Sequence, residues 1–284
     1  MANICILTDN LVQYPIIRFK GQNRIRKVSY HLSLNGEEIS DIHSINKSDL
    51  PPSADDNFNP HLLSPTISEL WDTLSLLTSN YDEVIGIFSS AAISPMYNIA
   101  QKAAAKLEAN ARIHIIDSRT SSVGLSILVM QAAIQAEKGE SSKTIIQNLY
   151  TKIPQIFTLF NIPSLSYLYY NNLIDRSQAF VGEKLGLLPY FVIEEDDFIT
   201  TDKMRNDRHI TDYFLEFLNE FENVEFVSFL HSTVLNSQAS KLIRELVKHK
   251  FPDAEFFEHK IPITLAILFG PKCQGMIVVD NEVL

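Results

Sequence analysis

The sequence predicts an α/β protein with two domains, each built from a sheet covered by helices. From residue 64 onward, short apolar segments typical of buried strands alternate with longer segments of helical periodicity, as in a parallel sheet covered by helices. With 284 residues, of which 45% are hydrophobic, the chain can bury one large core or two ordinary ones. The character of the sequence changes after Pro154. We therefore expect a mostly parallel N-terminal α/β domain at 1–157, a smaller C-terminal α/β domain at 158–284, and a ligand cleft between them.

The first sixty residues are expected to hold a buried strand, a hairpin and a loop. "ICILTD" at 4–9 is a short apolar run with polar residues at its end, typical of a parallel strand that leads into a site. The segment 24–41 alternates and contains Asn35-Gly36, the strongest short-range hairpin signal. Residues 46–61 hold three prolines and many polar side chains, which predicts a surface loop.

Between residues 64 and 156, helices and strands are expected to alternate. The helix at 64–80 carries Leu70, Leu74 and Leu77 on one face, and Pro65 suits an early helical position. Strands are expected at 83–88 and 112–117, and further helices at 95–108, 121–139 and 141–156.

The second half of the chain is expected to form another α/β unit. Residues 157–200 should hold short helices, a strand, a turn at 195–197 and a second strand. The spacing of apolar residues predicts a helix at 212–222. A strand at 224–231, a helix at 239–250 and a strand at 264–270 complete the unit.

Composition disfavours several classes of partner. Lysine plus arginine is 24 and aspartate plus glutamate is 34, so the net charge is −10, which disfavours nucleic acid and anionic membrane surfaces. The N-terminal stretch lacks the features of a signal peptide, and no apolar run reaches the ~18 residues of a membrane span. We therefore expect a cytoplasmic protein. Two cysteines without local spacing predict neither a disulfide framework nor a zinc site.

The serine-rich stretch "IFSSAAISPMYNIAQKAA" at 87–104 is the first candidate site, because ligands of open α/β sheets collect at the carboxyl ends of strands. Ser94 followed by Pro95 is a common pattern of a helix cap and the first helical residue. A helix start also favours anionic groups, so Ser94 can act as a cap, as a ligand contact, or as both. A nucleophilic role is disfavoured, because a nucleophile elbow uses the next residue's N–H and Pro95 has none.

Other catalytic patterns are missing from the sequence. It contains neither G-x-x-x-x-G-K-[ST] nor G-x-G-x-x-G, and its eight histidines include no i, i+4 pair, so nucleotide and metal chemistry are not expected. Asp9 and Asp117 each follow a predicted strand and are expected to orient loops by accepting backbone N–H bonds. His231 also ends a strand, and there a role in loop structure is favoured over catalysis.

Eight segments, in order along nearly the whole chain, resemble motifs of the DegV family of bacterial fatty-acid-binding proteins. "ILTDN" with Pro15 resembles the family's "TDS…P", "IFSSAAISPMYNIA" resembles "iSSxLSGTYxsA", and "IHIIDSRTSSVGLSILVMQAA" resembles "vhviDSxxvsxGxG". "LSYLYYNNLIDRSQAFVGEKLGLLPYFVIE" resembles "LxyLxxgGRIsxaxaxxGxlLxikP", and "FGPKCQGM" resembles "HxGPGalG". The resemblance implies two α/β domains that hold one fatty acid in the cleft between them, with no reaction performed by the protein itself.

The resemblance also implies a lipid-binding set. The family's carboxylate clamp is a threonine, the serine of "SGTY" and the histidine before "GPG". Ser94 matches the serine, whereas Leu62 stands at the threonine and Leu268 at the histidine. The expected lipid-binding residues are Ser94, Ser90, Leu62, Ser64, Leu268 and Ser118. Arg205 matches an arginine that helps to engage a fatty-acid kinase in kinase-dependent members.

The departures from the family pattern concern the lipid head group. Leu62, Leu268 and Pro95 each replace a residue that supplies a hydrogen bond in the family, and an ionised carboxylate without donors is costly in a dry cleft. Leu173 replaces the arginine of "GGRI". Two functions stay open. One is a non-catalytic carrier of a long-chain fatty acid or neutral lipid, with a fatty-acid kinase as its expected partner and no cofactor. The other is a degenerate relative that acts as an interaction or regulatory module without bound fatty acid.

Overall fold

The computed structural model describes residues 2–15, 18–39, 45–107, 112–194, 196–204, 209–232 and 238–281. The chain divides into two compact units. The first comprises Met1–Tyr30 and Ser64–Pro154, and the second comprises His31–Leu63 and Gln155–Leu284. The segment 31–63 therefore groups with the second half of the chain, and the domain boundary expected at 157–158 stays a prediction.

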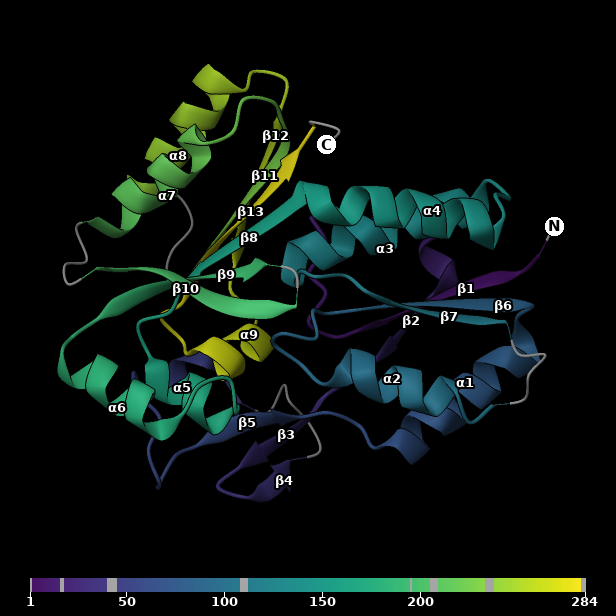
Figure 1. Ribbon diagram of the computed structural model, residues 1–284, viewed down its shortest axis with the longest axis horizontal. Helices are drawn as coiled ribbons and strands as arrows, with labels where there is room; N and C mark the ends of the chain where they lie inside the picture. Colours follow the sequence, from purple (N-terminus) through teal and green to yellow (C-terminus); the bar gives the residue numbers. More distant parts are fainter. Residues whose placement is uncertain are drawn as a thin grey trace. The chain divides into compact units, whose positions relative to one another are not determined.

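The first unit is a parallel sheet covered by helices on both faces, which confirms the expected α/β class. Its strand order is β2 (Ile25–Val28), β1 (Ile4–Asp9), β6 (Glu83–Phe88) and β7 (Ile113–Asp117), with every neighbouring pair parallel. The helices are α1 (Ile67–Asn80), α2 (Met96–Ala104), α3 (Ser122–Glu137) and α4 (Ser142–Lys152). Figure 1 shows α3 and α4 on one face of this sheet and α1 and α2 on the other. Short 3₁₀ helices lie at Gln22–Arg24 and Ile153–Gln155.

The second unit contains a six-stranded sheet with mixed pairing. Its order is β10 (Asp197–Met204), β9 (Leu188–Glu194), β8 (Ile156–Asn161), β13 (Gln274–Asp280), β11 (Val224–His231) and β12 (Glu255–Lys260). All pairs are antiparallel except β11 with β12. Helices α7 (Ile210–Asn219) and α8 (Gln238–Lys250) pack on one face through a core that includes Phe214, Phe229 and Val247.

The remaining elements of the second unit form a smaller layer. A three-stranded antiparallel sheet has the order β4 (Glu37–Ile39), β3 (His31–Leu34) and β5 (Pro60–Leu63), and a 3₁₀ helix lies at Lys47–Asp49. Helices α5 (Leu165–Tyr170) and α9 (Ile263–Phe269) pack on β5, and α6 (Arg176–Lys184) packs on α5 (Figure 1).

The predicted hairpin is confirmed at its turn and wrong in its extent. Asn35 and Gly36 both have positive φ, at 55° and 84°, as a two-residue turn between β3 and β4 requires. The residues before Tyr30 do not belong to it, because β2 pairs in parallel with β1 in the first unit. The loop expected at 46–61 is also too long, since β5 begins at Pro60.

The strand expected at 264–270 is wrong, because these residues form helix α9. Residues 264–269 are all buried. Their pattern of apolar residues therefore shows neither the two-residue period of a half-buried strand nor the 3.6-residue period of an amphipathic helix. The helix ends before Gly270, whose φ of 90° most side chains avoid. The actual last strand, β13, was not predicted, nor were β8 and β12.

Two helix starts differ from the prediction by a few residues. Pro65 lies outside α1, which Thr66 caps by accepting the Glu69 N–H at 3.2 Å while the Glu69 carboxylate accepts the Thr66 N–H at 2.7 Å. Pro95 occupies the cap position of α2, which begins at Met96. The predicted apolar face of α1 is confirmed, since Leu70, Leu74 and Leu77 are buried.

A glycine in the first unit gives a sharp test of the packing of α3. Gly21 has a φ of 81°, and a Cβ on it would lie 2.2 Å from the carbonyl oxygen of Ala133. We expect Gly21→Ala to lower the free energy of unfolding by about 3 kcal/mol, because it adds a backbone clash to the cost of a left-handed conformation. Gly36 has a similar φ of 84° but open space around it, so Gly36→Ala should cost about 1 kcal/mol. Urea denaturation followed by circular dichroism measures both, and equal losses would contradict the clash.

Candidate functional site

Two carboxylates organise the loops at the carboxyl end of the parallel sheet. Asp9 is buried at the end of β1, and its Oδ1 accepts the Leu11 N–H at 2.9 Å. Its two oxygens also accept the Ser89 N–H at 2.8 Å and the Ser89 hydroxyl at 2.9 Å. Asp117 ends β7 and accepts the Arg119 N–H at 2.8 Å and the Ala91 N–H at 3.1 Å. The predicted role of both side chains in ordering loops is therefore confirmed.

The serine-rich stretch after β6 forms a tight turn that places Ser94 at the start of α2. The N–H of Ser90 donates to the carbonyl of Thr120, which ties the turn to the loop after β7. The carbonyl of Ser90 in turn accepts the N–H groups of Ile93 and Ser94, each at 3.1 Å. Ser94 Oγ accepts the Met96 N–H at 3.1 Å, so Ser94 does bond the first turn of the helix.

Ser94 also bonds a residue that the sequence analysis did not single out. Its Oγ lies 2.5 Å from the hydroxyl of Tyr30, and both side chains are buried. Tyr30 is held in place by its own N–H, which donates to Asn10 Oδ1 at 3.1 Å, next to Asp9. The sequence places Tyr30 in an alternating segment where an aromatic side chain reads as ordinary core, so only the contact reveals it.

The electrostatic surroundings keep Tyr30 protonated. Burial raises its pKa well above the usual value, and the nearby charge of Asp9 raises it further, against the opposing effect of the bond to Ser94. Burial also raises the pKa of Asp9 to about 6, although the bonds from Ser89 and Leu11 act in the other direction. Tyr30 is therefore a phenol that can donate a hydrogen bond.

The two hydroxyls together have one hydrogen left over. Ser94 and Tyr30 each carry one O–H, and the bond between them uses one of the two. Within the described part of the chain, the remaining O–H has no acceptor, whichever of the two residues carries it. A buried donor without a partner is unfavourable, so the pair is suited to a ligand with an acceptor oxygen.

Unlike Ser94 and Tyr30, some other buried hydroxyls of this unit make no hydrogen bond within the described part of the chain. Among the residues that the structure describes, Thr8 Oγ1, Ser64 Oγ and Ser121 Oγ have no hydrogen-bond partner. Thr8 precedes Asp9 on β1, and Ser121 precedes α3, so both belong to the same carboxyl end of the sheet. Ser64 was expected from the sequence, whereas the other two were not.

The remaining expected residues of the first unit have internal roles in the structure. Ser90 Oγ accepts the Ala92 N–H at 3.2 Å. Ser118 Oγ donates to the carbonyl of Thr120 at 3.1 Å and accepts its N–H at 3.3 Å. Both hydroxyls therefore shape the loops next to Ser94.

The two expected leucines belong to the second unit. Leu62 lies on β5, and its N–H donates to Asn171 Oδ1 at 3.1 Å. Leu268 is buried in α9, and the amide of Asn171 also donates to the carbonyl of Ile267 at 2.9 Å. Asn171 thus links the two elements that carry the leucines. Arg205 lies outside the described residues.

The described residues include no group of three or more His, Cys, Asp or Glu side chains placed to hold a metal ion. Nor does any described helix combine the length and the apolar character needed to cross a membrane.

The first unit is a parallel α/β sheet with the buried hydroxyl pair of Ser94 and Tyr30 beyond the carboxyl ends of its strands, the edge at which ligands of open α/β sheets bind. The chain belongs to the DegV family, whose model is described as that of an uncharacterised protein and matches residues 3–281. This confirms the resemblance drawn from the sequence motifs.

Relatives of known sequence or structure cover nearly the whole chain. A DegV domain-containing protein of Caldanaerobacter subterraneus subsp. tengcongensis is 29% identical over 287 residues, which cover 92% of this chain and 100% of that protein. The crystal structure of DegV, a fatty acid binding protein from Bacillus subtilis, matches with a TM-score of 0.79 at 21% identity over 99% of this chain and 100% of the other. The Fatty Acid Kinase (Fak) B3 protein of Streptococcus pneumoniae, loaded with linoleic acid, matches with a TM-score of 0.79 at 14% identity over 98% and 100%. At these identities, the two structural matches establish a shared fold.

Proposed function

We propose that this protein binds a long-chain fatty acid and that Ser94 and Tyr30 hold its carboxyl group. The observation that carries the proposal is the leftover O–H of this buried pair, which needs an acceptor such as a carboxyl oxygen. The structural relatives from Bacillus subtilis and Streptococcus pneumoniae, which are described as binding fatty acid or as loaded with it, support the same ligand class.

We propose that this site serves binding alone and that the protein performs no reaction on the fatty acid. Within the residues that the structure describes, the Ser94 hydroxyl contacts a phenol and a backbone N–H, neither of which is a base that could activate it. The residue after Ser94 is Pro95, which has no N–H to stabilise an oxyanion. A hydroxyl pair of this kind can position a carboxyl group for another protein.

The Streptococcus pneumoniae relative takes its name from a fatty acid kinase, which suggests the class of partner. We propose that this protein presents its fatty acid to such a kinase in the cytoplasm, and that Arg205 belongs to the contact surface. The ligand cleft between the two domains, and the places of Leu62 and Leu268 beside the lipid, stay predictions.

Solvent extraction of the purified protein tests the fatty acid directly. The protein is denatured and extracted, and the extract is analysed by mass spectrometry. We expect a long-chain fatty acid close to one equivalent, and a much smaller amount after Ser94 and Tyr30 are both replaced. Clean extracts from several wild-type preparations would support the alternative function, an interaction module without bound lipid, which the hydrocarbon side chains of Leu62 and Leu268 favour.

A further inference from the structure

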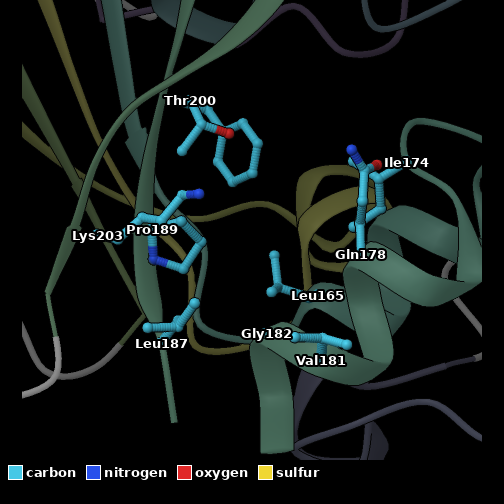
Figure 2. Close-up of a pocket in the computed structure, with 10 residues that line it drawn as sticks. Leu165, Ile174, Gln178, Val181, Gly182, Leu187, Pro189, Thr200 and Lys203 are labelled. Atoms are coloured by element: carbon cyan, nitrogen blue, oxygen red, sulfur yellow. The ribbon is translucent and has the colours of Figure 1, made fainter. Parts of the chain in front are cut away.

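The six-stranded sheet of the second unit has two edges of different character. At one edge, β10 contains a β-bulge, a shift of register between Thr200 and Asp202. Figure 2 shows Thr200 and Lys203 of this strand at the wall of a pocket. At the other edge, β12 pairs in parallel with β11 along all 6 of its residues, in one continuous register. The β12 edge is therefore the regular one.

Half of the backbone hydrogen-bonding groups of β12 point away from β11. The N–H of Ile261, just beyond β12, donates to the carbonyl of His231 at 3.0 Å, so the odd-numbered residues of β12 face β11. Successive residues of a strand direct these groups to opposite sides, so those of the even-numbered residues, beginning with Phe256, point outward. Within the described part of the chain, no strand pairs with this outer side. Because every residue of β12 is half-buried or exposed, a further strand can be added there.

One side of α8 lies over this edge. Nη2 of Arg244 lies 2.8 Å from Oε2 of Glu258, and the guanidinium carbon lies 5.3 Å from the centroid of the Phe256 ring. Lys241 and Lys248, three residues before Arg244 and four after it, share its side of the helix. All three cations are exposed. A row of positive charge therefore runs along the open side of β12.

The acidic residues nearby leave this row with a net positive charge. Glu258, which β12 directs toward α8, is paired with Arg244, and its side chain is only 7% exposed. Neither Lys241 nor Lys248 forms an ion pair within the described residues, although Glu245 lies on the same helix. The row is therefore complementary to carboxylate groups.

The opposite face of the same edge is aromatic. Neighbouring residues of a strand point to opposite faces, so Phe257 points away from α8. Its ring stacks on that of Phe226 in β11, with 5.3 Å between the centroids, and Phe257 is half-buried. A strand added beside β12 would have one face at the cations of α8 and the other beside this aromatic pair. That position fits a segment in which acidic and apolar residues alternate.

The spacing of the cations fits such a segment. From Lys241 to Lys248, helix α8 rises about 10 Å. Side chains on one face of an extended strand recur about every 7 Å. About two or three acidic residues at alternate positions therefore come within reach of the row.

We propose that the β12 edge binds an extended acidic segment of another protein, which adds a strand to the sheet through main-chain hydrogen bonds. Its acidic residues face Lys241, Arg244 and Lys248, and the apolar residues between them lie beside Phe257. A second copy of this chain is disfavoured as the occupant, because twofold pairing of two β12 edges would place both rows of cations on one face of the joined sheet. The surface belongs to the second unit, so it stands apart from the fatty-acid head-group pair in the first.

Fluorescence anisotropy with the full chain and a labelled peptide, Ser-Glu-Val-Glu-Val-Glu-Val-Ser, tests the surface. We expect this peptide to bind at least about tenfold more tightly than one with lysine at every glutamate, because attraction to the row becomes repulsion. Raising the salt concentration from about 50 mM to about 500 mM should weaken the acidic peptide by about threefold or more. No binding of this peptide up to about 1 mM, or equal binding of the two peptides, would overturn the proposal.

Methylation of the peptide's backbone nitrogens tests the pairing itself. One peptide is methylated on its glutamates and another on its valines. In a paired strand, the N–H groups of only one of these sets face β12. We expect one methylated peptide to lose at least about tenfold in affinity and the other to lose less than about threefold. A similar loss in both peptides, or a loss in neither, would show that the segment does not pair as a strand.

Substitution of the lysines tests the row of cations. Lys241→Gln together with Lys248→Gln should weaken the acidic peptide about tenfold, because each exposed ion pair contributes up to about fivefold. The matched control is Lys102→Gln together with Lys143→Gln, exposed in α2 and α4, which changes the net charge equally and should bind as wild type does. An equal loss in the control, or an unchanged affinity in the first variant, would show that the row does not bind the peptide.

Analytical ultracentrifugation distinguishes the proposed partner from a second copy of the chain. We expect the protein to sediment as a monomer at the concentrations of the peptide titration, and to remain so when the peptide is bound. A dimer that the acidic peptide dissociates would assign the β12 edge to a second copy and would overturn the proposal.

Discussion

Replacing Ser94 and Tyr30 together is expected to weaken fatty-acid binding by about tenfold to a hundredfold, while each single replacement costs less than about fivefold. The reason is the count of hydroxyl hydrogens. The pair has two, uses one internally and offers one to the ligand. Ser94→Ala leaves the O–H of Tyr30, and Tyr30→Phe leaves the O–H of Ser94, so either single variant still offers one donor. Only the double variant has none.

A double-mutant cycle measures this difference. Delipidated wild type, both single variants and the double variant are titrated with palmitate, and the coupling energy is taken from the four affinities. Ser79→Ala, on the exposed side of α1, and Tyr150→Phe, on the surface of α4, are matched controls that should bind as wild type does. Large and additive single effects would mean that both hydroxyls contact the ligand separately. An unchanged affinity for palmitate in the double variant would show that Ser94 and Tyr30 do not bind the carboxyl group.

The contribution of Asp9 to the stability of the protein is expected to fall as the pH rises from about 4 to about 6. The pKa of Asp9 is about 6 in the folded protein, against 3.8 for the ordinary carboxyl group. Because the folded state binds this proton more tightly than the unfolded state, the contribution of Asp9 is fully present below about 3.8 and is lost as the pH passes about 6. The difference corresponds to about 3 kcal/mol.

Asp9→Asn isolates this contribution from that of the other carboxyl groups. Urea unfolding of the wild type and the variant is compared at intervals between pH 3.5 and 7, and the difference between the two should shrink as the pH rises. The substituted amide retains an oxygen for the Leu11 N–H or the Ser89 hydroxyl, but its NH₂ group faces the Ser89 N–H, so a fixed loss is expected at low pH. The matched control is Asp72→Asn, on the exposed side of α1. The difference in free energy of unfolding between it and the wild type should stay constant across this pH range. A constant difference between wild type and Asp9→Asn across this range would contradict the raised pKa.

The parallel sheet of the first unit was predictable because its strands carry simple signals. β1, β6 and β7 are short runs with apolar cores, each followed by polar residues, and they recur between amphipathic helices. The second unit was harder, because α9 is buried on all sides and β12 mixes charged with aromatic residues. Neither segment has a regular spacing of apolar residues that identifies it as a helix or a strand.

The candidate site was predictable only in part, for a related reason. Ser94 precedes a proline at the start of a helix, a local pattern that the sequence displays directly. Tyr30 reaches Ser94 from 64 positions away, through the approach of two loops that no local pattern encodes. The face of β10 on which the Lys203 side chain lies depends on a register shift, which leaves no visible mark in the sequence.

The bulge in β10 interrupts an edge of the six-stranded sheet, a place where another chain could pair. β10 lies at one edge of the six-stranded sheet, where a regular strand would present an unbroken row of N–H and C=O groups to another chain. The extra residue between Thr200 and Asp202 interrupts that row, and the charges of Asp202 and Lys203 stand beside the interruption. This single irregularity thus breaks the regular edge that strand pairing with another chain would need.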